Sequence, residues 1–244
     1  MHGPLLWLSI AVAFGLGLLG LRLVRLAGRT GELPELLLGL FFVSVGPLGF
    51  LPNFLVDLWP GARPDYVLLA RAVGATGRVL AIALLCLFTW RVFRGRSRWA
   101  PWLTGVVLVA LMAGFAHSAL VERFESGGAR DAWWHLRMAT RAVVVLWCTA
   151  EPLHFHVLAR RRVALGLMEP LVANRFLLWS VWGGACLTVQ LLAYASAYLD
   201  LAQGPVAAIR AAAGIAAGGA VWLTFFPPAG YRRRVERIAA APPD

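Results

Sequence analysis

Seven apolar stretches dominate this chain, and each is about as long as the roughly 20 residues that an α-helix needs to cross a bilayer. They cover residues 4–24, 34–58, 66–90, 101–121, 132–158, 171–199 and 205–227, with ends uncertain by a few residues. Charged residues make up only 14% of the 244 residues, against about 25% in a soluble domain. The sequence therefore predicts an all-α, polytopic membrane protein with seven transmembrane helices.

The placement of arginine predicts the orientation of these helices. All 23 basic residues are arginine, and three of them, Arg63, Arg123 and Arg130, lie in connections on one side. The connections and the tail on the other side hold fifteen: Arg22, Arg25, Arg29, Arg91, Arg94, Arg96, Arg98, Arg160, Arg161, Arg162, Arg175, Arg232, Arg233, Arg234 and Arg237. Because arginine-rich connections stay in the cytoplasm, we expect the N-terminus outside and the C-terminus inside. A single seven-helix domain would cover residues 1–230, with a short cytoplasmic tail at 231–244.

Composition also excludes several classes of function. The formal net charge of +11 follows the membrane orientation, and no platform of basic and aromatic residues accompanies it, so a nucleic-acid partner is not expected. The absence of lysine excludes a retinal Schiff base. The cysteines Cys86, Cys148 and Cys186 lie in apolar stretches without a CxxC pair, which is typical of buried apolar residues.

Apart from Arg22 and Arg175, which lie close to the arginine-rich ends of their stretches, five arginines lie within the apolar stretches: Arg71, Arg78, Arg137, Arg141 and Arg210. A midplane arginine costs about 2.5–3.5 kcal/mol on insertion scales. At 1.5 Å per residue, Arg78 and Arg141 lie roughly 18 and 14 Å from the outer ends of their helices, near the middle of a core about 30 Å thick. In the segment "RAVGATGR", Gly74 and Gly77 leave room beside Arg71 and Arg78 for a neighbouring helix or a ligand.

Two kinds of partner could offset the cost of burying these charged arginines. Arg71, Arg137 and Arg210 can reach the outer boundary, where Asp65, Asp131 and Asp200 are available. Neither Arg78 nor Arg141 has an acid at matching depth. They bond either to backbone carbonyls and polar side chains or to an anionic group that both share.

We expect the second alternative, with an outward-facing cavity that binds a small anionic or lipid-like ligand. The predicted ligand-binding residues are Asn53, Arg71, Arg78, Arg137, Arg141, Gln190, Tyr194 and Arg210.

The segment "EPLHFH" holds an acid in the inner half of the fifth stretch. Glu151 and His154 have the spacing of one half of a di-iron carboxylate site, but such sites need two copies. We therefore expect no metal there. Glu151 either pairs with an inner arginine, such as Arg175 or Arg91, or carries a proton.

Two further histidines keep a redox alternative open. His117 and His135 fall near the outer ends of neighbouring stretches and could ligate a haem. Against a joint site, His135 and Arg137 point about 200° apart on a helix.

The segments "RRRVALGLMEPLVANRFLLW" and "WLTFFPPAGYRRRVER" resemble parts of uncharacterised bacterial seven-helix membrane proteins. This resemblance implies placement in a bacterial inner membrane and no particular activity. The favoured function is a receptor or sensor with a separate output protein. One alternative is a small-solute transporter, proton-coupled through Glu151, and another is a haem- or quinone-carrying redox protein. We predict no catalytic residue, metal ligand or cofactor, since the sequence holds no nucleophile–base pair, phosphate loop or paired metal motif.

Overall fold

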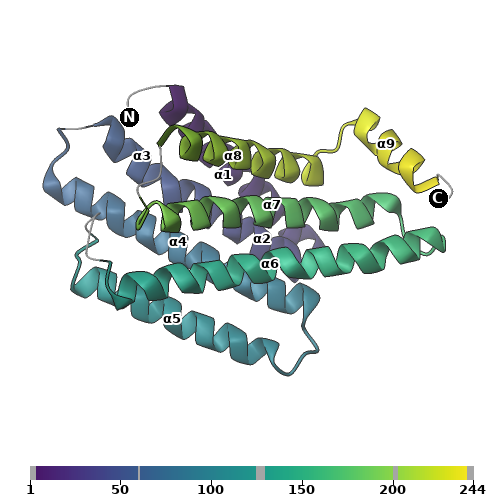
Figure 1. Ribbon diagram of the computed structural model, residues 1–244, viewed down its shortest axis with the longest axis horizontal. Coiled ribbons are helices and arrows are strands. Elements are labelled where there is room, and N and C mark those ends of the chain that lie inside the picture. Colours follow the sequence, from purple (N-terminus) through teal and green to yellow (C-terminus); the bar gives the residue numbers. More distant parts are fainter. Residues whose placement is uncertain (1–3, 60, 125–129, 200–202, 241–244) are drawn as a thin grey trace. The chain divides into compact units, whose positions relative to one another are not determined.

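The computed structural model describes residues 4–59, 61–124, 130–199 and 203–240, and every regular element in these ranges is a helix (Figure 1). The elements are α1 (Pro4–Thr30), α2 (Leu33–Val43), the π-helix η1 (Ser44–Phe50), α3 (Leu51–Leu58), α4 (Pro64–Phe93), α5 (Ala100–Leu120), α6 (Ala132–Ala164), α7 (Pro170–Ala195), α8 (Gln203–Phe225) and α9 (Ala229–Ala240).

Seven helical segments in the described ranges are long and apolar enough to cross a membrane: Ser9–Thr30, Leu33–Leu58, Pro64–Phe93, Ala100–Leu120, Ala132–Ala164, Pro170–Ala195 and Gly204–Phe225. Each overlaps one of the seven predicted stretches. The all-α class and a multi-pass membrane protein with seven helices of spanning length are thus confirmed.

Several helices extend past the apolar stretches into arginine-rich sequence. The first ends at Thr30, not near residue 24, and α6 ends at Ala164, not near residue 158. Arginine continues a helix because its aliphatic stem lies along the helix while the guanidinium reaches water. What ends α1 is Gly31, whose φ of +73° suits glycine and whose N–H donates to the Ala27 carbonyl over 2.8 Å.

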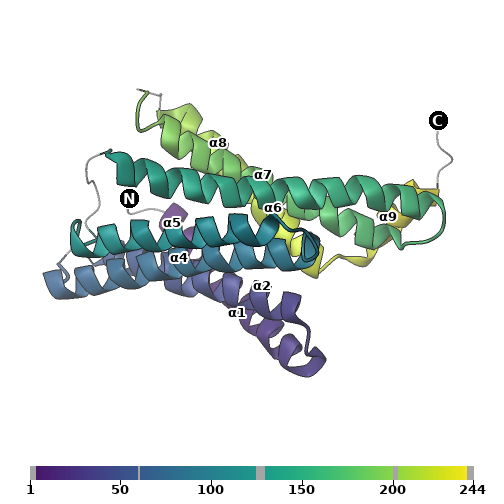
Figure 2. The ribbon, with the colours of Figure 1, turned by 90° about the horizontal axis from the view of Figure 1, so that it is seen from below.

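The chain divides into two compact units, residues 1–141 and 142–244, with the boundary inside α6. In the first unit α1 packs on α2, and α4 packs on α2, η1, α3 and α5. Figure 2 shows the pairing of α1 with α2, and Figure 1 shows α4 beside α5.

The second membrane span is built from α2, η1 and α3 in sequence. The sequence predicted one continuous helix over 34–58. Pro47 lies inside η1 and Pro52 is the second residue of α3, and neither has an N–H for the helical ladder. The hydrogen bonds shift register accordingly, so that the Leu51 N–H donates to the Gly46 carbonyl five residues back.

In the second unit α7 packs on both α8 and α9. Gly183 of α7 admits Thr149 of α6, and the Phe155 and Phe176 rings lie 6.0 Å apart. The short helix α9 begins two residues before the predicted tail, 231–244, and continues into it. It is held by the Asn174 side-chain amide, which donates to the Tyr231 hydroxyl over 2.8 Å.

Candidate functional site

A cavity of about 240 Å³ lies in the first unit. Its walls come from α3, α4, α5, the turn after α5 and the first turns of α6. The lining residues are Asn53, Arg71, Ala75, Arg78, Val79, Ala110, Leu111, Gly114, Phe115, Ser118, Glu122, Phe124, Arg137 and Arg141. Five of the eight residues predicted from the sequence therefore line one cavity, namely Asn53, Arg71, Arg78, Arg137 and Arg141.

Arg78 is held by the protein itself. Its Nη1 donates to the Gly49 carbonyl over 2.8 Å, and the Asn53 side-chain amide donates to the same carbonyl over 3.2 Å. Gly49 lies in η1, where the register of backbone hydrogen bonds is irregular. Such irregular backbone is tolerated inside a membrane when side chains satisfy its polar groups. Arg78 and Asn53 satisfy the Gly49 carbonyl of η1. Of the two alternatives that the sequence left open for Arg78, the structure therefore shows the bond to a backbone carbonyl.

The two glycines of "RAVGATGR" bring η1 and α3 against α4. A Cβ on Gly77 would lie 2.5 Å from the Leu48 carbonyl carbon and 2.6 Å from the Gly49 nitrogen. A Cβ on Gly74 would collide with the side-chain amide of Asn53. The space that these glycines leave is thus filled by protein, and it lets Arg78 reach the η1 backbone.

Arg137 is held differently, by a carboxylate. Its Nη2 donates to Glu122 Oε1 over 2.8 Å, and Glu122 Oε2 accepts the Ser118 hydroxyl over 2.9 Å. Gly114 makes room for the arginine stem, since a Cβ there would lie 2.8 Å from Arg137 Cγ. Arg137 Nη1 is buried and, among the described residues, has no hydrogen-bond partner. A buried guanidinium N–H of this kind can donate to one more anionic or carbonyl oxygen.

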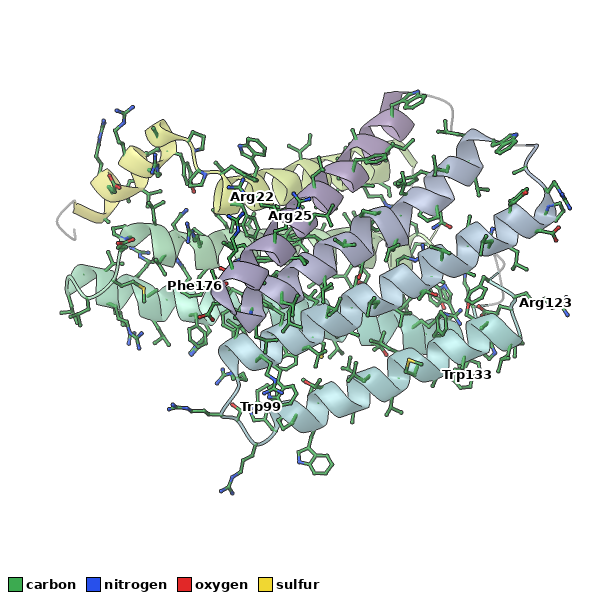
Figure 3. The ribbon with its side chains drawn as sticks, turned by 180° about the vertical axis from the view of Figure 1, so that it is seen from behind. Arg22, Arg25, Trp99, Arg123, Trp133 and Phe176 are labelled. Atoms are coloured by element: carbon green, nitrogen blue, oxygen red, sulfur yellow. The ribbon has the colours of Figure 1, made fainter. Side chains whose placement is uncertain are left out.

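A sharp turn after α5 brings Glu122 to the cavity. Arg123 and Phe124 have φ values of 49° and 58°, a conformation uncommon outside glycine. The turn packs the Phe124 ring 5.6 Å from that of Phe115. It also leaves Arg123 exposed, pointing away from the helices at the end of α5 opposite Trp99 (Figure 3).

Arg141 and Arg71 line the cavity without a hydrogen bond or ion pair to any residue in the described part of the chain. Four arginines and one glutamate give the lining a formal charge of 4 − 1 = +3. Charges in a site with little water interact strongly. The arrangement is suited to bind a compact anion through several charge-assisted hydrogen bonds.

The other three predicted ligand residues belong to the second unit and are not among the lining residues. Gln190 and Tyr194 lie on α7, where the Tyr194 and Tyr198 rings are 5.3 Å apart. Arg210 lies on α8, and its Nε is buried without a hydrogen-bond partner among the described residues. Asp200, the acid considered for Arg210, lies outside the described residues.

The acid of the segment "EPLHFH" is buried. Glu151 is 6% exposed, and its Oε1 accepts a hydrogen bond from Trp147 Nε1 over 3.1 Å. His154 is exposed, while His156 Nδ1 lies 2.8 Å from the Ala173 carbonyl.

Sequence reasoning missed the role of Glu122 and Ser118. It offered Asp131 to Arg137, but Asp131 Oδ1 accepts the N–H of Trp134 and so caps α6, while Glu122 holds Arg137. The signal was present in part, because Ser118 and Glu122 are four residues apart at a helix end.

Comparisons with protein-family models, with curated proteins and with solved structures found no match to this chain.

Proposed function

We propose that this multi-pass membrane protein binds a small anion in the arginine-lined cavity and acts as a receptor or sensor that passes the signal to a separate protein. One observation carries the proposal: Arg141 has no partner among the described residues, in a cavity whose lining carries a formal charge of +3. An arginine in a membrane cannot lose its proton to escape the cost of burial. A carboxylate or phosphate held by Arg141 and the unpartnered Nη1 of Arg137 offsets that cost.

The cavity volume limits the size of the ligand. At about 30 Å³ per water molecule, 240 Å³ holds roughly eight waters. That is below the about 300–1,000 Å³ typical of sites for drug-sized ligands. Ala75, Val79, Leu111 and Phe115 supply apolar surface beside the arginines. The ligand class is thus a phosphate or a short carboxylic acid, or the headgroup of a lipid whose chains stay outside.

The orientation is part of this proposal. Fifteen arginines in alternate segments favour the N-terminus outside and the C-terminus inside. Placement in a bacterial inner membrane rests on the resemblance of the two segments quoted above to bacterial seven-helix membrane proteins. The turn with Glu122 then faces outward and the ligand enters from outside. A binding role without catalysis or a cofactor accounts for this lining.

Thermal unfolding of the purified chain in detergent tests the binding site. Inorganic phosphate, succinate and, as the neutral control, glycerol are titrated at constant ionic strength. A ligand at 100 times its Kd stabilises the folded state by about 2.7 kcal/mol. We expect phosphate or succinate, and not glycerol, to raise the midpoint with the logarithm of its concentration once the concentration exceeds Kd.

In R141M the anion affinity should fall about tenfold or more, because a hydrogen bond to a charged group contributes about 1.5–3 kcal/mol. The matched control is R63M, since Arg63 is 73% exposed. Equal affinity in the wild-type chain and R141M, or no rise of the midpoint with either anion, contradicts the proposal.

Transport of the same anion is the second candidate, favoured by the buried carboxylate of Glu151. Buried acids in membrane helices commonly carry protons. Uptake of radiolabelled phosphate or succinate into proteoliposomes under a proton gradient, lost in E151Q, would favour transport. Binding without uptake favours the receptor.

A further inference from the structure

A second group of potential ligands lies at the outer end of α5. His117, Glu122 and Asp131 each place one nitrogen or oxygen atom within 4.8 Å of the others. They come from the last turn of α5, the turn after it and the residue before α6. The side chains of His117 and Glu122 are only 14% and 15% exposed. Of these three residues, Glu122 is shared with the arginine-lined cavity.

We propose that His117, Glu122 and Asp131 bind a divalent transition-metal ion, with Zn²⁺ as the best fit. Zinc binds imidazole nitrogens and carboxylate oxygens, and three protein donors leave a fourth position open to water. Zinc–ligand bonds of about 2.0–2.2 Å place the donor atoms of a tetrahedral site about 3.3–3.6 Å apart. His117 Nδ1 and Glu122 Oε1 already lie 3.5 Å apart.

The state of His117 supports this assignment independently. Its Nδ1 is buried and, among the described residues, makes no hydrogen bond, since the 3.5 Å to Glu122 is an ion-pair distance only. Stacking on Trp133, with centroids 4.8 Å apart and planes 14° apart, orients the ring. A buried imidazole nitrogen beside a carboxylate, with no proton shared between them, is a position that a metal ion satisfies.

Asp131 has one oxygen in use and a second to offer. Its Oδ1 accepts the Trp134 N–H over 2.8 Å, which orients the carboxylate at the start of α6. Metal-binding carboxylates are commonly oriented by such a hydrogen bond. The carboxylate of Asp131 is thus held in place by a hydrogen bond to the first turn of α6.

Arg137 competes with the metal for Glu122. Its Nη2 lies 2.8 Å from Oε1, the same oxygen that faces His117. A metal on Oε1 replaces the guanidinium, which then turns wholly toward the cavity that it lines. Metal and anion therefore strengthen each other's binding, and linkage requires the effect to be reciprocal. The metal site itself does not depend on the proposed function, whereas this coupling rests on it.

The first experiment measures zinc binding to the full chain in detergent, after removal of metals with a chelator. Isothermal titration calorimetry with zinc chloride and elemental analysis after dialysis should both give one zinc per chain. H117A and D131N should weaken binding by about 100-fold or more, since loss of even an outer-shell partner costs about 10–100-fold. D131N keeps the helix cap, because asparagine caps as well as aspartate.

The matched controls are H154A, an exposed histidine, and D65N, an acid 82% exposed beside Arg63. Both should bind zinc as the wild-type chain does. Substoichiometric zinc, or equal affinity in H117A and D131N and the wild-type chain, overturns the metal site.

A second experiment tests the competition between Arg137 and the metal by the direction in which zinc affinity changes. R137M keeps the aliphatic stem against Gly114 and removes the charge, so zinc affinity should rise while phosphate affinity falls. Unchanged or weaker zinc binding in R137M overturns the competition. In R141M zinc binding should persist although phosphate binding is lost, which separates failure of the metal site from failure of the anion site.

Discussion

The two walls of the cavity treat their arginines in opposite ways. On the wall of α3 and α4, Arg78 donates to the Gly49 carbonyl of the adjoining η1, with Asn53 beside it. On the wall of α6, Arg141 has no hydrogen bond or ion pair to the described residues. Both arginines lie deep within membrane-spanning segments. The contrast teaches that depth alone does not tell which arginine the protein itself compensates, since a neighbouring irregular helix can supply the compensation.

The first wall depends on backbone contact, and breaking that contact should have the largest effect. In G77A the new Cβ would lie 2.5 Å from the backbone of Leu48, so η1 must move away from α4. Overpacking of this kind costs about 1–3 kcal/mol. We expect a large fall in the midpoint of thermal unfolding in detergent. G105A is the matched control, because no atom lies within 4 Å of a Cβ there. Equal midpoints for the two variants would mean that η1 does not press on α4.

The contrast between the arginines predicts a stability gap between two variants. R141M removes a cation that has no partner among the described residues, whereas R78M also removes the charge-assisted hydrogen bond to Gly49. Without added anion, R78M should therefore be less stable than R141M by about 1.5–3 kcal/mol. Chemical or thermal unfolding of both variants in the same detergent measures the gap. If R78M were as stable as R141M, or more stable, the hydrogen bond of Arg78 to Gly49 would not distinguish the two arginines.

Substitution of Glu122, the partner of Arg137 on the α6 wall, should produce the smallest change. In E122Q the carboxylate that holds Arg137 becomes neutral, and the formal charge of the lining rises from +3 to +4. Phosphate affinity, measured by calorimetry with a chelator present, should rise by about tenfold, since a partner with full charge contributes about 1.5 kcal/mol more than none. S118A is the matched control, because it removes one hydrogen bond to Glu122 and keeps its charge. A fall in phosphate affinity in E122Q would show that Glu122 orients Arg137 for the anion and does not compete with it.

Much of the fold follows from hydropathy. Seven predicted stretches correspond to seven helices of spanning length, because a chain in lipid must satisfy its backbone within each segment. The ends were less predictable, since arginine continues α1 as far as Thr30 and the conformation of Gly31 ends it. The π-helix η1 was missed as well, because prolines within an apolar stretch leave the hydropathy unchanged.

For the site, the sequence by itself determined which residues are unfavourable to bury. An arginine in an apolar segment raises the free energy of membrane insertion in any fold, so Arg71, Arg78, Arg137 and Arg141 could be singled out from position alone. Only the tertiary structure decided what offsets that cost at each of them. Arg78 meets a carbonyl 29 residues away along the chain and Arg137 meets a carboxylate 15 residues away. Pairings of that range depend on how helices approach one another, and helix approach is set by contacts such as Gly77 against η1, which no local pattern specifies.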